Sequence, residues 1–357
     1  MLRAVRYLLG SPGASGFGSR STAEEVTPVL GGTTAIITGA TSGIGAETAR
    51  VLAKRGARVV IPARSAKAAE DVRARIVAEC PAADVLVLPL DLSSLASVRA
   101  FADRFLELGL PLHLLINNAG KFSHGQLALS EDGVEMTFAT NYLGHFLLTK
   151  LLAGRMAETA AAMGVQGRIV SVSSSVHGWF AGDWAEYLHL VTRRKILTTT
   201  SHCVGNGMWA GRPYDATQAY AVSKLANVLH TRELAARLQE MGANVTVNCV
   251  HPGIVRTRLN RDREGAAATT CYVAAHPRVA GVSGRYFADC NEALPSPAAT
   301  DRHEAARLWR VSEAIIDGCT STSTGHPRQD CTTAPLLRFL PAQTQTGASS
   351  SPRRRAC

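Results

Sequence analysis

Tyr220 and Lys224 are the two side chains whose types and spacing best suit acid–base chemistry in this 357-residue chain. They stand four residues apart in Thr217–Gln239, a stretch that reads as a helix, so they share one face. A phenol with its ordinary pKa of about 10 is a poor base at neutral pH, and a neighbouring ammonium lowers that pKa. The alternative is a plain surface pair, which the same spacing also produces.

A glycine-rich turn could hold a dinucleotide beside that pair. It occupies residues 38–45, follows a short apolar strand at Thr33–Ile37 and precedes a helix expected over Ala46–Lys54. A phosphate here would meet backbone N–H groups and the positive end of the helix. The spacing G-x-x-x-G-x-G is not the commoner G-x-G-x-x-G, and a turn that binds nothing is the alternative. The turn residues expected to contact the cofactor are Thr38, Gly39, Ser42, Gly43, Ile44 and Gly45.

The second apolar strand, Ala57–Ile61, leads to Arg64 rather than to an acid. Many NAD enzymes carry an acidic residue here that binds the adenine ribose hydroxyls. This chain has no acid between Arg58 and Ala69, and a guanidinium can bind a 2′-phosphate through two hydrogen bonds. The sequence therefore favours NADP over NAD, the alternative being a solvated surface arginine.

Further apolar strands alternate with helical stretches. Val85–Leu90 precedes Asp91 and Leu92, and Leu112–Ile116 precedes the run Asn117-Asn118-Ala119-Gly120. Such alternation predicts an α/β fold with a doubly wound parallel sheet of the Rossmann type, whose ligand crevice lies at the carboxyl ends of the strands. We expect a single domain over residues 30–317, with Gly284–Phe287 as its final strand and Glu304–Ile316 as its closing helix.

Taken together, these motifs resemble the short-chain dehydrogenase/reductase family over roughly residues 30–257. The stretches 43–49 and 221–227 resemble its retinol-dehydrogenase-like branch, which includes the WW-domain oxidoreductases and plant members associated with the chloroplast import translocon. Residues 15–26 resemble the plant members, and no WW domain is apparent. The matching positions are the 38–45 turn, Asp91-Leu92, Asn117–Gly120, Asn141, Ser171–Ser174, Tyr220, Lys224 and Pro252-Gly253.

The resemblance implies roles for these side chains. Tyr220 would be the general acid/base, and Lys224 its electrostatic helper and a ligand of the nicotinamide ribose. Asn141, in a helical stretch expected over Gly133–Leu152, would hold a water that links Lys224 to solvent. The hydride would come from the cofactor. The further cofactor contacts implied are Asp91, Leu92, Asn118, Ala119, Gly120, Tyr220, Lys224, Pro252, Gly253, Val255 and Thr257.

The catalytic serine has several candidates on and after the strand 168–172. The family motif aligns Ser174 with the serine that hydrogen-bonds the substrate oxygen. Ser173 and Ser175 stay open as alternatives, and Ser171 lies nearby.

Three departures from the branch stand out. Ser174 and Tyr220 are further apart than usual, and the excess lies in Leu197–Arg212, which has no periodicity and is expected to be a mobile loop beside the cleft. The substrate-covering segment after Thr257 is short, which puts turnover in more doubt than cofactor binding. The tail 318–357 is rich in Ser, Thr, Pro, Gln and Gly and is expected to be disordered. A splice-variant-like product and a divergent enzyme both fit this combination.

Composition narrows the partners. The eight cysteines show no metal-ligand spacing, so we expect no metal site and reduced thiols in an intracellular protein. No apolar run approaches the ~20 residues of a membrane span. The net charge of +10 suits a phosphorylated cofactor or an anionic membrane surface, and nothing beyond that charge supports nucleic-acid binding. Peripheral membrane association and a homo-oligomer stay open.

Residues 1–29 are expected to form an N-terminal arm. They contain Arg3, Arg6 and Arg20 and no acid before Glu24. That composition is compatible with a transit peptide or a membrane-surface anchor, and equally with an ordinary disordered arm. The sequence therefore leaves the chloroplast, including its envelope, and the cytoplasm open as locations.

The sequence predicts an NADP-dependent oxidoreductase that interconverts a carbonyl and an alcohol on a small lipophilic substrate. The alternative from another class is a weakly active or inactive NADP-binding regulatory or scaffold protein with an import-translocon-type partner. The intact Asn141, Ser174, Tyr220 and Lys224 favour the enzyme, and the changed loops favour the alternative.

Overall fold

The computed structural model describes residues 11–123, 125–192, 213–253 and 261–320. Within these ranges the chain forms one eight-stranded sheet in the order β3-β2-β1-β4-β5-β6-β7-β8. The strands are β1 (Thr34–Ile37), β2 (Arg58–Ala63), β3 (Val85–Pro89), β4 (Leu114–Asn117), β5 (Gly167–Val172), β6 (Val245–His251), β7 (Tyr286–Ala288) and β8 (Asn291–Ala293).

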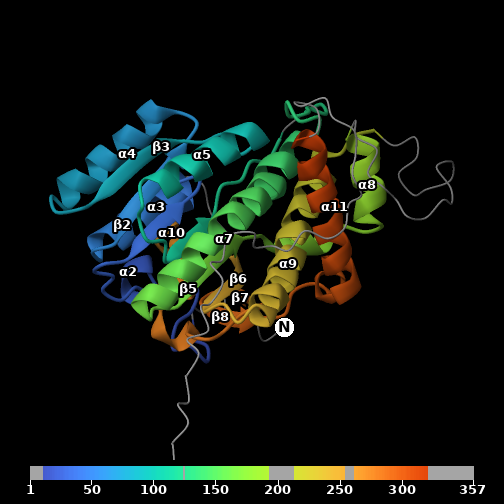
Figure 1. The fold of residues 1–357 in the computed structure, drawn as a ribbon. Helices are drawn as coiled ribbons and strands as arrows, with labels where there is room; N and C mark the ends of the chain where they lie inside the picture. Colours follow the sequence, from blue (N-terminus) through green and yellow to red (C-terminus); the bar gives the residue numbers. More distant parts are fainter. Residues whose placement is uncertain (1–10, 124, 193–212, 254–260, 321–357) are drawn as a thin grey trace, which may run out of the picture.

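Helices cover both faces of this sheet (Figure 1). They are α2 (Ala23–Val26), α3 (Gly43–Lys54), α4 (Ala66–Glu79), α5 (Leu95–Glu107), α6 (Met136–Phe138), α7 (Gly144–Met163), α8 (Trp184–Val191), α9 (Ala216–Glu240), α10 (Arg261–Ala275) and α11 (Arg302–Thr320). A π-helical turn, Ala139–Leu143, joins α6 to α7, and short 3₁₀ turns lie at Ser175–Trp179, Pro277–Val279 and Pro297–Thr300.

The predicted doubly wound sheet is confirmed. Strands β1 to β7 pair in parallel, and β1 lies between β2 and β4, so the chain reverses its direction of travel across the sheet at this point. The chain segments that leave β1 and β4 thus run toward opposite halves of the sheet, and the crevice of this class of fold is expected at the carboxyl ends of these strands.

Two details differ from the sequence prediction. The final strand is β8, which pairs antiparallel with β7 through Tyr286 and Ala293, rather than the stretch Gly284–Phe287. The helix expected over Gly133–Leu152 begins only at Met136 and passes through the π turn before α7. Both differences arise in short segments whose tertiary pairing outweighs their weak local pattern.

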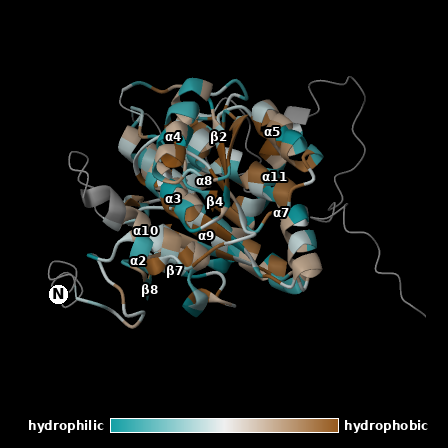
Figure 2. Cartoon of the chain, turned by 90° about the vertical axis from the view of Figure 1, so that its left-hand side faces the viewer, coloured by the Kyte–Doolittle hydropathy of each residue, from teal (hydrophilic) through white to brown (hydrophobic). Residues whose placement is uncertain are grey.

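The apolar side chains form one core on each side of the sheet. Phe101 of α5, Phe146 of α7 and Trp309 of α11 belong to the core on one side. Leu52 of α3 and Ala267 of α10 belong to the core on the other. Figure 2 shows the hydrophobic colours turned inward and the hydrophilic ones outward on the helices. Burial on both faces explains why the strands are continuous apolar runs.

Residues 11–29 pack against the domain and extend its ordered part beyond the 30–317 span expected from the motifs. Ala23 and Val26 of α2 are completely buried, and the Phe17 ring lies edge-on to Tyr272 at 5.7 Å between centroids. Glu24 bonds Lys54 of α3 at 3.0 Å. At the other end of the chain, α11 extends past the expected boundary at 317.

Several predictions fall outside the described residues. They concern the loop Leu197–Arg212, the shortened segment after Thr257, the tail from residue 321 onward and the first ten residues. Among the helices that the structure describes, none is both long and apolar enough to cross a bilayer.

Candidate active site

The glycine turn between β1 and α3 allows close backbone approach. A Cβ atom on Gly45 would lie 2.4 Å from both the Asn118 side-chain nitrogen and the Gly39 carbonyl oxygen. Gly39 itself has a φ of +67° and would place a Cβ 2.7 Å from the Cα of Ala119. Side chains at these two positions would fill the crevice, so glycine is required for the turn and the loop after β4 to meet.

The turn and that loop are tied by a closed set of hydrogen bonds. The Asn118 side-chain amide donates to the Thr38 carbonyl at 2.8 Å. The backbone N–H groups of Asn118 and Ala119 each donate to the Thr38 hydroxyl at 3.0 Å. Thr38 is completely buried, so it lies behind the crevice rather than in its wall.

The crevice is a groove of about 570 Å³ at the switch point of the sheet. The N-terminus of α3 opens into it, which suits an anionic group such as a pyrophosphate. It brings together eleven of the predicted cofactor contacts. Thr38 lies behind it, Tyr220, Lys224, Pro252 and Gly253 do not line it, and Val255 and Thr257 lie outside the described residues. The predicted residues that line it are Gly39, Ser42, Gly43, Ile44, Gly45, Arg64, Asp91, Leu92, Asn118, Ala119 and Gly120.

Arg64 stands exposed at one end of the groove, next to Ser65, the residue that caps the N-terminus of α4. Arg58, the first residue of β2, forms an ion pair with Asp84 at 2.6 Å. No ion pair found among the described residues involves Arg64. Its guanidinium can therefore meet a phosphate without first breaking an ion pair of this kind.

Tyr220 and Lys224 share the inner face of α9, as predicted. The Lys224 ammonium donates to the Val172 carbonyl at 3.0 Å, where β5 ends, and lies 5.5 Å from the centroid of the Tyr220 ring. Lys224 is 3% exposed, and burial lowers its pKa to about 8. Burial raises the pKa of Tyr220. Desolvation disfavours the phenolate, which runs against the lowering of the Tyr220 pKa expected from the ammonium.

The three candidate serines have different surroundings. Ser173 is buried, and its hydroxyl donates to the Lys224 carbonyl at 2.8 Å. Ser175 is exposed. Ser174 is half-buried at the start of the 3₁₀ turn, and its hydroxyl oxygen accepts only a 3.3 Å bond from Val176 N–H. Of the three, Ser174 combines partial shelter with a hydroxyl that acts as an acceptor in its bond to Val176 and so keeps its proton for a further partner, which supports its alignment with the substrate-binding serine.

Asn141 lies in the π-helical turn and is completely buried. Its side-chain oxygen accepts the Lys121 N–H at 2.8 Å, and its nitrogen donates to the Lys121 carbonyl at 3.0 Å and to Ser223 Oγ at 3.0 Å. A Cβ on Gly120 would lie 3.3 Å from the Lys224 ammonium and 3.6 Å from the Asn141 side-chain oxygen. Asn141 thus stands beside Lys224 and fixes the backbone of the loop after β4.

The sequence reasoning missed an apolar group near these polar ones. Phe122 is 40% exposed and lies edge-on to the Tyr220 ring at 5.3 Å between centroids. Phe122 follows the Asn117–Gly120 motif by two residues, and that position was the available signal in the sequence for a ring near the site.

A separate shallow groove of about 540 Å³ is lined mainly by Leu127, Leu129, Leu190 and Val191.

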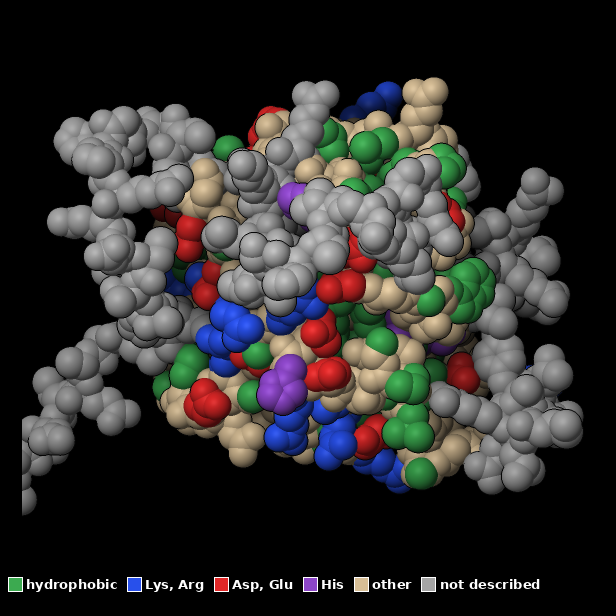
Figure 3. Space-filling model, turned by 90° about the vertical axis from the view of Figure 1, so that its right-hand side faces the viewer, with side chains coloured by type: hydrophobic (Ala, Val, Ile, Leu, Met, Phe, Trp, Pro, Cys, Tyr) green, Lys and Arg blue, Asp and Glu red, His purple; other side chains and the backbone are tan. Residues whose placement is uncertain are grey.

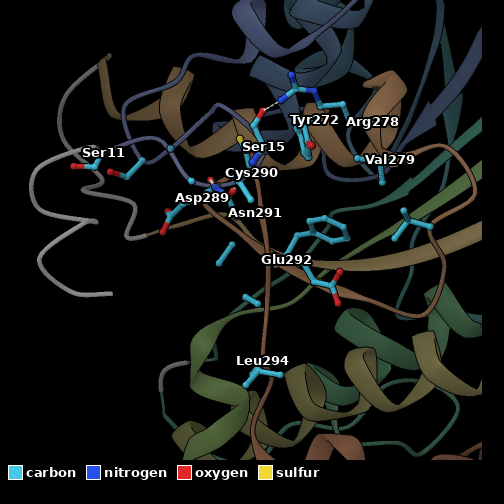
Figure 4. A pocket seen from close by; sticks show the side chains of 18 residues that line it. Ser11, Ser15, Tyr272, Arg278, Val279, Asp289, Cys290, Asn291, Glu292 and Leu294 are labelled. Atoms are coloured by element: carbon cyan, nitrogen blue, oxygen red, sulfur yellow. Dashed lines mark hydrogen bonds between the residues drawn. The ribbon is translucent and has the colours of Figure 1, made fainter. Parts of the chain in front are cut away.

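A second hollow of about 780 Å³ lies between the N-terminal arm and β8 (Figure 4). Its polar side chains mostly hold the arm in place: Asn291 accepts from the Ser15 N–H at 3.0 Å, and Arg278 donates to the Ser15 carbonyl. None of the predicted site residues lines it. It is therefore a product of arm packing at the sheet edge and is separate from the groove beside α3.

On the face that carries α8 and α11, basic and acidic side chains are interspersed rather than gathered by sign (Figure 3). Within the described ranges no group of three potential ligands is placed to hold a metal ion. The groove beside α3 and the side chains of α9 thus remain the best-defined chemical site.

Comparison with known families agrees with this geometry. Residues 33–187 match the family described as short chain dehydrogenase, and residues 186–282 match the one described as Enoyl-(Acyl carrier protein) reductase. Short-chain dehydrogenase TIC 32 B, chloroplastic, of Brassica napus is 44% identical over 330 residues, covering 86% of this chain and 97% of the relative.

Further relatives act on alcohols by name. Human retinol dehydrogenase 14 is 39% identical, covering 81% of this chain and 87% of the relative. Mouse polyprenol dehydrogenase is 40% identical, with 80% and 84% covered. Among solved structures, a protein of Mycobacterium paratuberculosis superposes with a TM-score of 0.66 at 33% identity, covering 83% of this chain and 97% of that one. The Pseudomonas aeruginosa RhlG/NADP complex gives 0.54 at 25%, with 76% and 97% covered.

Proposed function

The chain belongs to the short-chain dehydrogenase/reductase family of oxidoreductases, and on that premise we propose that it uses NADPH to interconvert a lipophilic carbonyl and its alcohol. The observation that carries the cofactor proposal is the groove beside α3. Its glycines Gly39 and Gly45 leave no room for a Cβ atom, and Arg64 is among the residues that line it. A dinucleotide fits this donor set, since the turn offers backbone N–H groups and a helix N-terminus to a pyrophosphate.

Each residue of the proposed site has a definite task. The glycine turn and Arg64 would hold the pyrophosphate and the 2′-phosphate, and Pro252 and Gly253 would flank the nicotinamide end. The bound cofactor supplies or accepts the hydride. Tyr220 exchanges the proton of the substrate oxygen, and Ser174 donates a hydrogen bond to the same oxygen.

Lys224 and Asn141 support that proton transfer. Lys224 is held beneath the Tyr220 ring by the Val172 carbonyl, so its positive charge opposes the desolvation that raises the pKa of Tyr220. Asn141 holds the neighbouring backbone at Lys121 and stands beside the ammonium. From that place it can orient a water toward Lys224.

The proposed substrate class rests on the apolar surroundings of Tyr220. The Phe122 ring borders the phenol, and burial of apolar substrate surface against such a ring contributes about 25 cal/mol per Å². The names of the retinol and polyprenol dehydrogenase relatives point the same way. The relatives called chloroplastic support a chloroplast location, which a C-terminal fluorescent fusion expressed in plant cells would test.

One set of measurements tests the proposal. The purified protein is titrated with NADPH and NADH, and then assayed with each cofactor on a series of aldehydes and ketones of increasing chain length. We expect tighter binding of NADPH and a kcat/KM that rises with chain length. Tight NADPH binding without turnover on any member would instead favour the cofactor-sensing regulatory alternative. Absence of binding to either dinucleotide would overturn both.

A further inference from the structure

His145 lies at the junction between the glycine turn and the π-helical turn, although no sequence motif nominated it. It sits in the first turn of α7 and is 3% exposed. One ring nitrogen, Nε2, lies 2.8 Å from the Thr38 hydroxyl oxygen. The other, Nδ1, lies 3.1 Å from the Asn141 carbonyl oxygen. The ring thus bridges two predicted site residues that are 103 positions apart in sequence.

The partners of this ring determine where its proton lies. A carbonyl oxygen only accepts hydrogen bonds, so Nδ1 must carry the hydrogen that points at Asn141. Nε2 is then an acceptor, and it receives the Thr38 hydroxyl proton. The Thr38 oxygen in turn accepts the N–H groups of Asn118 and Ala119. The Thr38 hydroxyl also lies 3.4 Å from the Ile116 carbonyl, a longer contact than the 2.8 Å one to Nε2, and Nδ1 keeps its hydrogen whichever acceptor the hydroxyl uses.

The surroundings keep the ring neutral. The pKa of His145 is lowered to about 4: burial is the main cause, the hydrogen bond to Asn141 opposes it, and the positive charge of Lys224 adds to the lowering. His230, the other buried histidine near it, also has a lowered pKa because of burial. The Nδ1–H form is therefore the state present at neutral pH.

We infer that His145 is a positioning residue that couples the dinucleotide turn to the catalytic end of the site. This inference rests on the proposed function and adds a residue to it. Through Thr38 the ring sets the loop that carries Asn118 and Ala119. Through the Asn141 carbonyl it positions the π turn. The Asn141 side chain in that turn bonds the Lys121 backbone and the Ser223 hydroxyl. Ser223 in turn donates to the Tyr220 carbonyl at 2.7 Å.

Three substitutions separate the two bonds of the ring. His145→Phe removes both and keeps an aromatic ring, which is larger than imidazole. His145→Gln places an amide near the position of Nε2 and can still accept from Thr38. His145→Asn places an amide near the position of Nδ1 and can still donate to the Asn141 carbonyl.

His113 offers a matched control elsewhere in the sheet. It is also 3% exposed, and its Nδ1 accepts the Thr34 N–H at 3.0 Å where β1 begins, at the end opposite the groove. His113→Phe therefore removes a buried histidine bond without touching the site. It measures how much a general loss of stability changes binding.

The experiment measures NADPH affinity by titration, kcat and KM, and thermal stability for the wild type and these variants. We expect His145→Phe to weaken NADPH binding and to lower kcat by about tenfold each, the size of one lost buried hydrogen bond. His145→Gln should restore NADPH affinity to within about threefold of wild type but leave kcat low, and His145→Asn should show the reverse. His113→Phe should lower thermal stability with affinity and kcat unchanged. Wild-type affinity and kcat in His145→Phe would overturn the inference, as would losses matching those of His113→Phe at equal stability.

A readout without cofactor keeps the test decisive if His145→Phe fails to fold. In a ¹⁵N spectrum of histidine-labelled wild type we expect both His145 and His177 in the Nδ1–H form at neutral pH, because the Nδ1 of His177 also faces a carbonyl oxygen, that of Ser174. Of these two signals, only the one from His145 should be absent from His145→Gln. An Nε2–H or charged ring at this position would overturn the inference by itself. A correct tautomer in a protein that binds neither dinucleotide would sink the proposed function and leave the observed bridge intact.

Discussion

The glycine turn after β1 and the Tyr220–Lys224 segment of α9 both lie at the carboxyl ends of the parallel strands. The functional groups of the two regions are held in place in different ways. In the turn, backbone atoms and side chains meet at contact distance, and the buried hydrogen bonds of Thr38 and Asn118 are satisfied. On α9, an ammonium is buried beneath a phenol, and the pKa values of both groups are displaced by that burial.

The difference separates stability from reactivity. A fitted turn lowers the free energy of the fold and of cofactor binding together, so a change there should damage both. A buried charge raises the free energy of the fold and is useful only when substrate is present. Changes on α9 should therefore remove turnover while leaving the fold unharmed, or more stable. Four substitutions test this contrast.

Tyr220→Phe should have the largest effect. It keeps the ring that contacts Phe122 and Lys224 but removes the proton donor, so kcat should fall by about 10²- to 10⁴-fold. NADPH affinity and thermal stability should stay near wild type. Steady-state kinetics with a parallel binding titration check this, and retained turnover would mean that another group supplies the proton.

Gly45→Ala should come next, with the opposite profile. Its Cβ would stand 2.4 Å from two atoms of the turn, so the loop after β4 must move, at a cost of about 1–3 kcal/mol. We expect a loss of roughly tenfold to 100-fold in NADPH affinity together with a lower melting temperature. Gly31→Ala is the control, because a Cβ there meets nothing within 4 Å. Equal effects from the two substitutions would show that the turn is not tightly fitted.

Arg64→Asp should change cofactor choice without changing the fold. The loss of a charge-assisted phosphate contact costs about 1.5–3 kcal/mol, roughly 10- to 100-fold in NADPH affinity. NADH affinity should change little, so the preference for NADPH over NADH becomes smaller. Arg58→Gln, which removes an arginine already paired with Asp84, is the control and should leave both affinities unchanged. If Arg64→Asp binds NADPH as tightly as wild type, Arg64 does not contact the 2′-phosphate.

Lys224→Met should change the free energy of unfolding only slightly, and the sign of that change is the test. The pKa of Lys224 lies at about 8 in the folded chain and ordinarily at 10.5, so the unfolded state binds its proton more tightly and wild-type stability rises with pH between these values. Methionine removes the buried charge, while the Val172 carbonyl keeps its bond from Asn227. We expect the variant to be inactive but about 1–2 kcal/mol more stable at pH 7 by denaturant unfolding. A large loss of stability would show that the ammonium is structural.

The parts of the site that the sequence predicted are those in which one residue type is required locally. Gly39 and Gly45 lie so close to neighbouring atoms that only glycine fits at these positions. The spacing of Tyr220 and Lys224 follows from the helix period. Strand β8 and the packing of residues 11–29 depend instead on partners far away in sequence, such as Ser15 with Asn291. Local periodicity cannot reveal such pairs.

His145 escaped prediction for a related reason. A histidine in an apolar helix reads as an ordinary core residue, and only the distances to Thr38 and Asn141 show what its two nitrogens do. The π turn was hidden in the same way, because its sequence fits a regular helix. π turns concentrate at functional sites, which agrees with its place beside Lys224.

The N-terminal arm has a practical consequence for anyone who handles this protein. Between Ser15 and Val26 it fastens the last strand to α3, the helix that starts at the glycine turn, through Asn291 at one end and Glu24 at the other. A protease or a cloning boundary that removes this stretch would therefore remove the contacts that stabilise β8 and connect it to α3, although the catalytic motifs stay complete. An N-terminal tag belongs upstream of Ser11, and a shortened expression product that keeps all the motifs should still be judged by its melting curve.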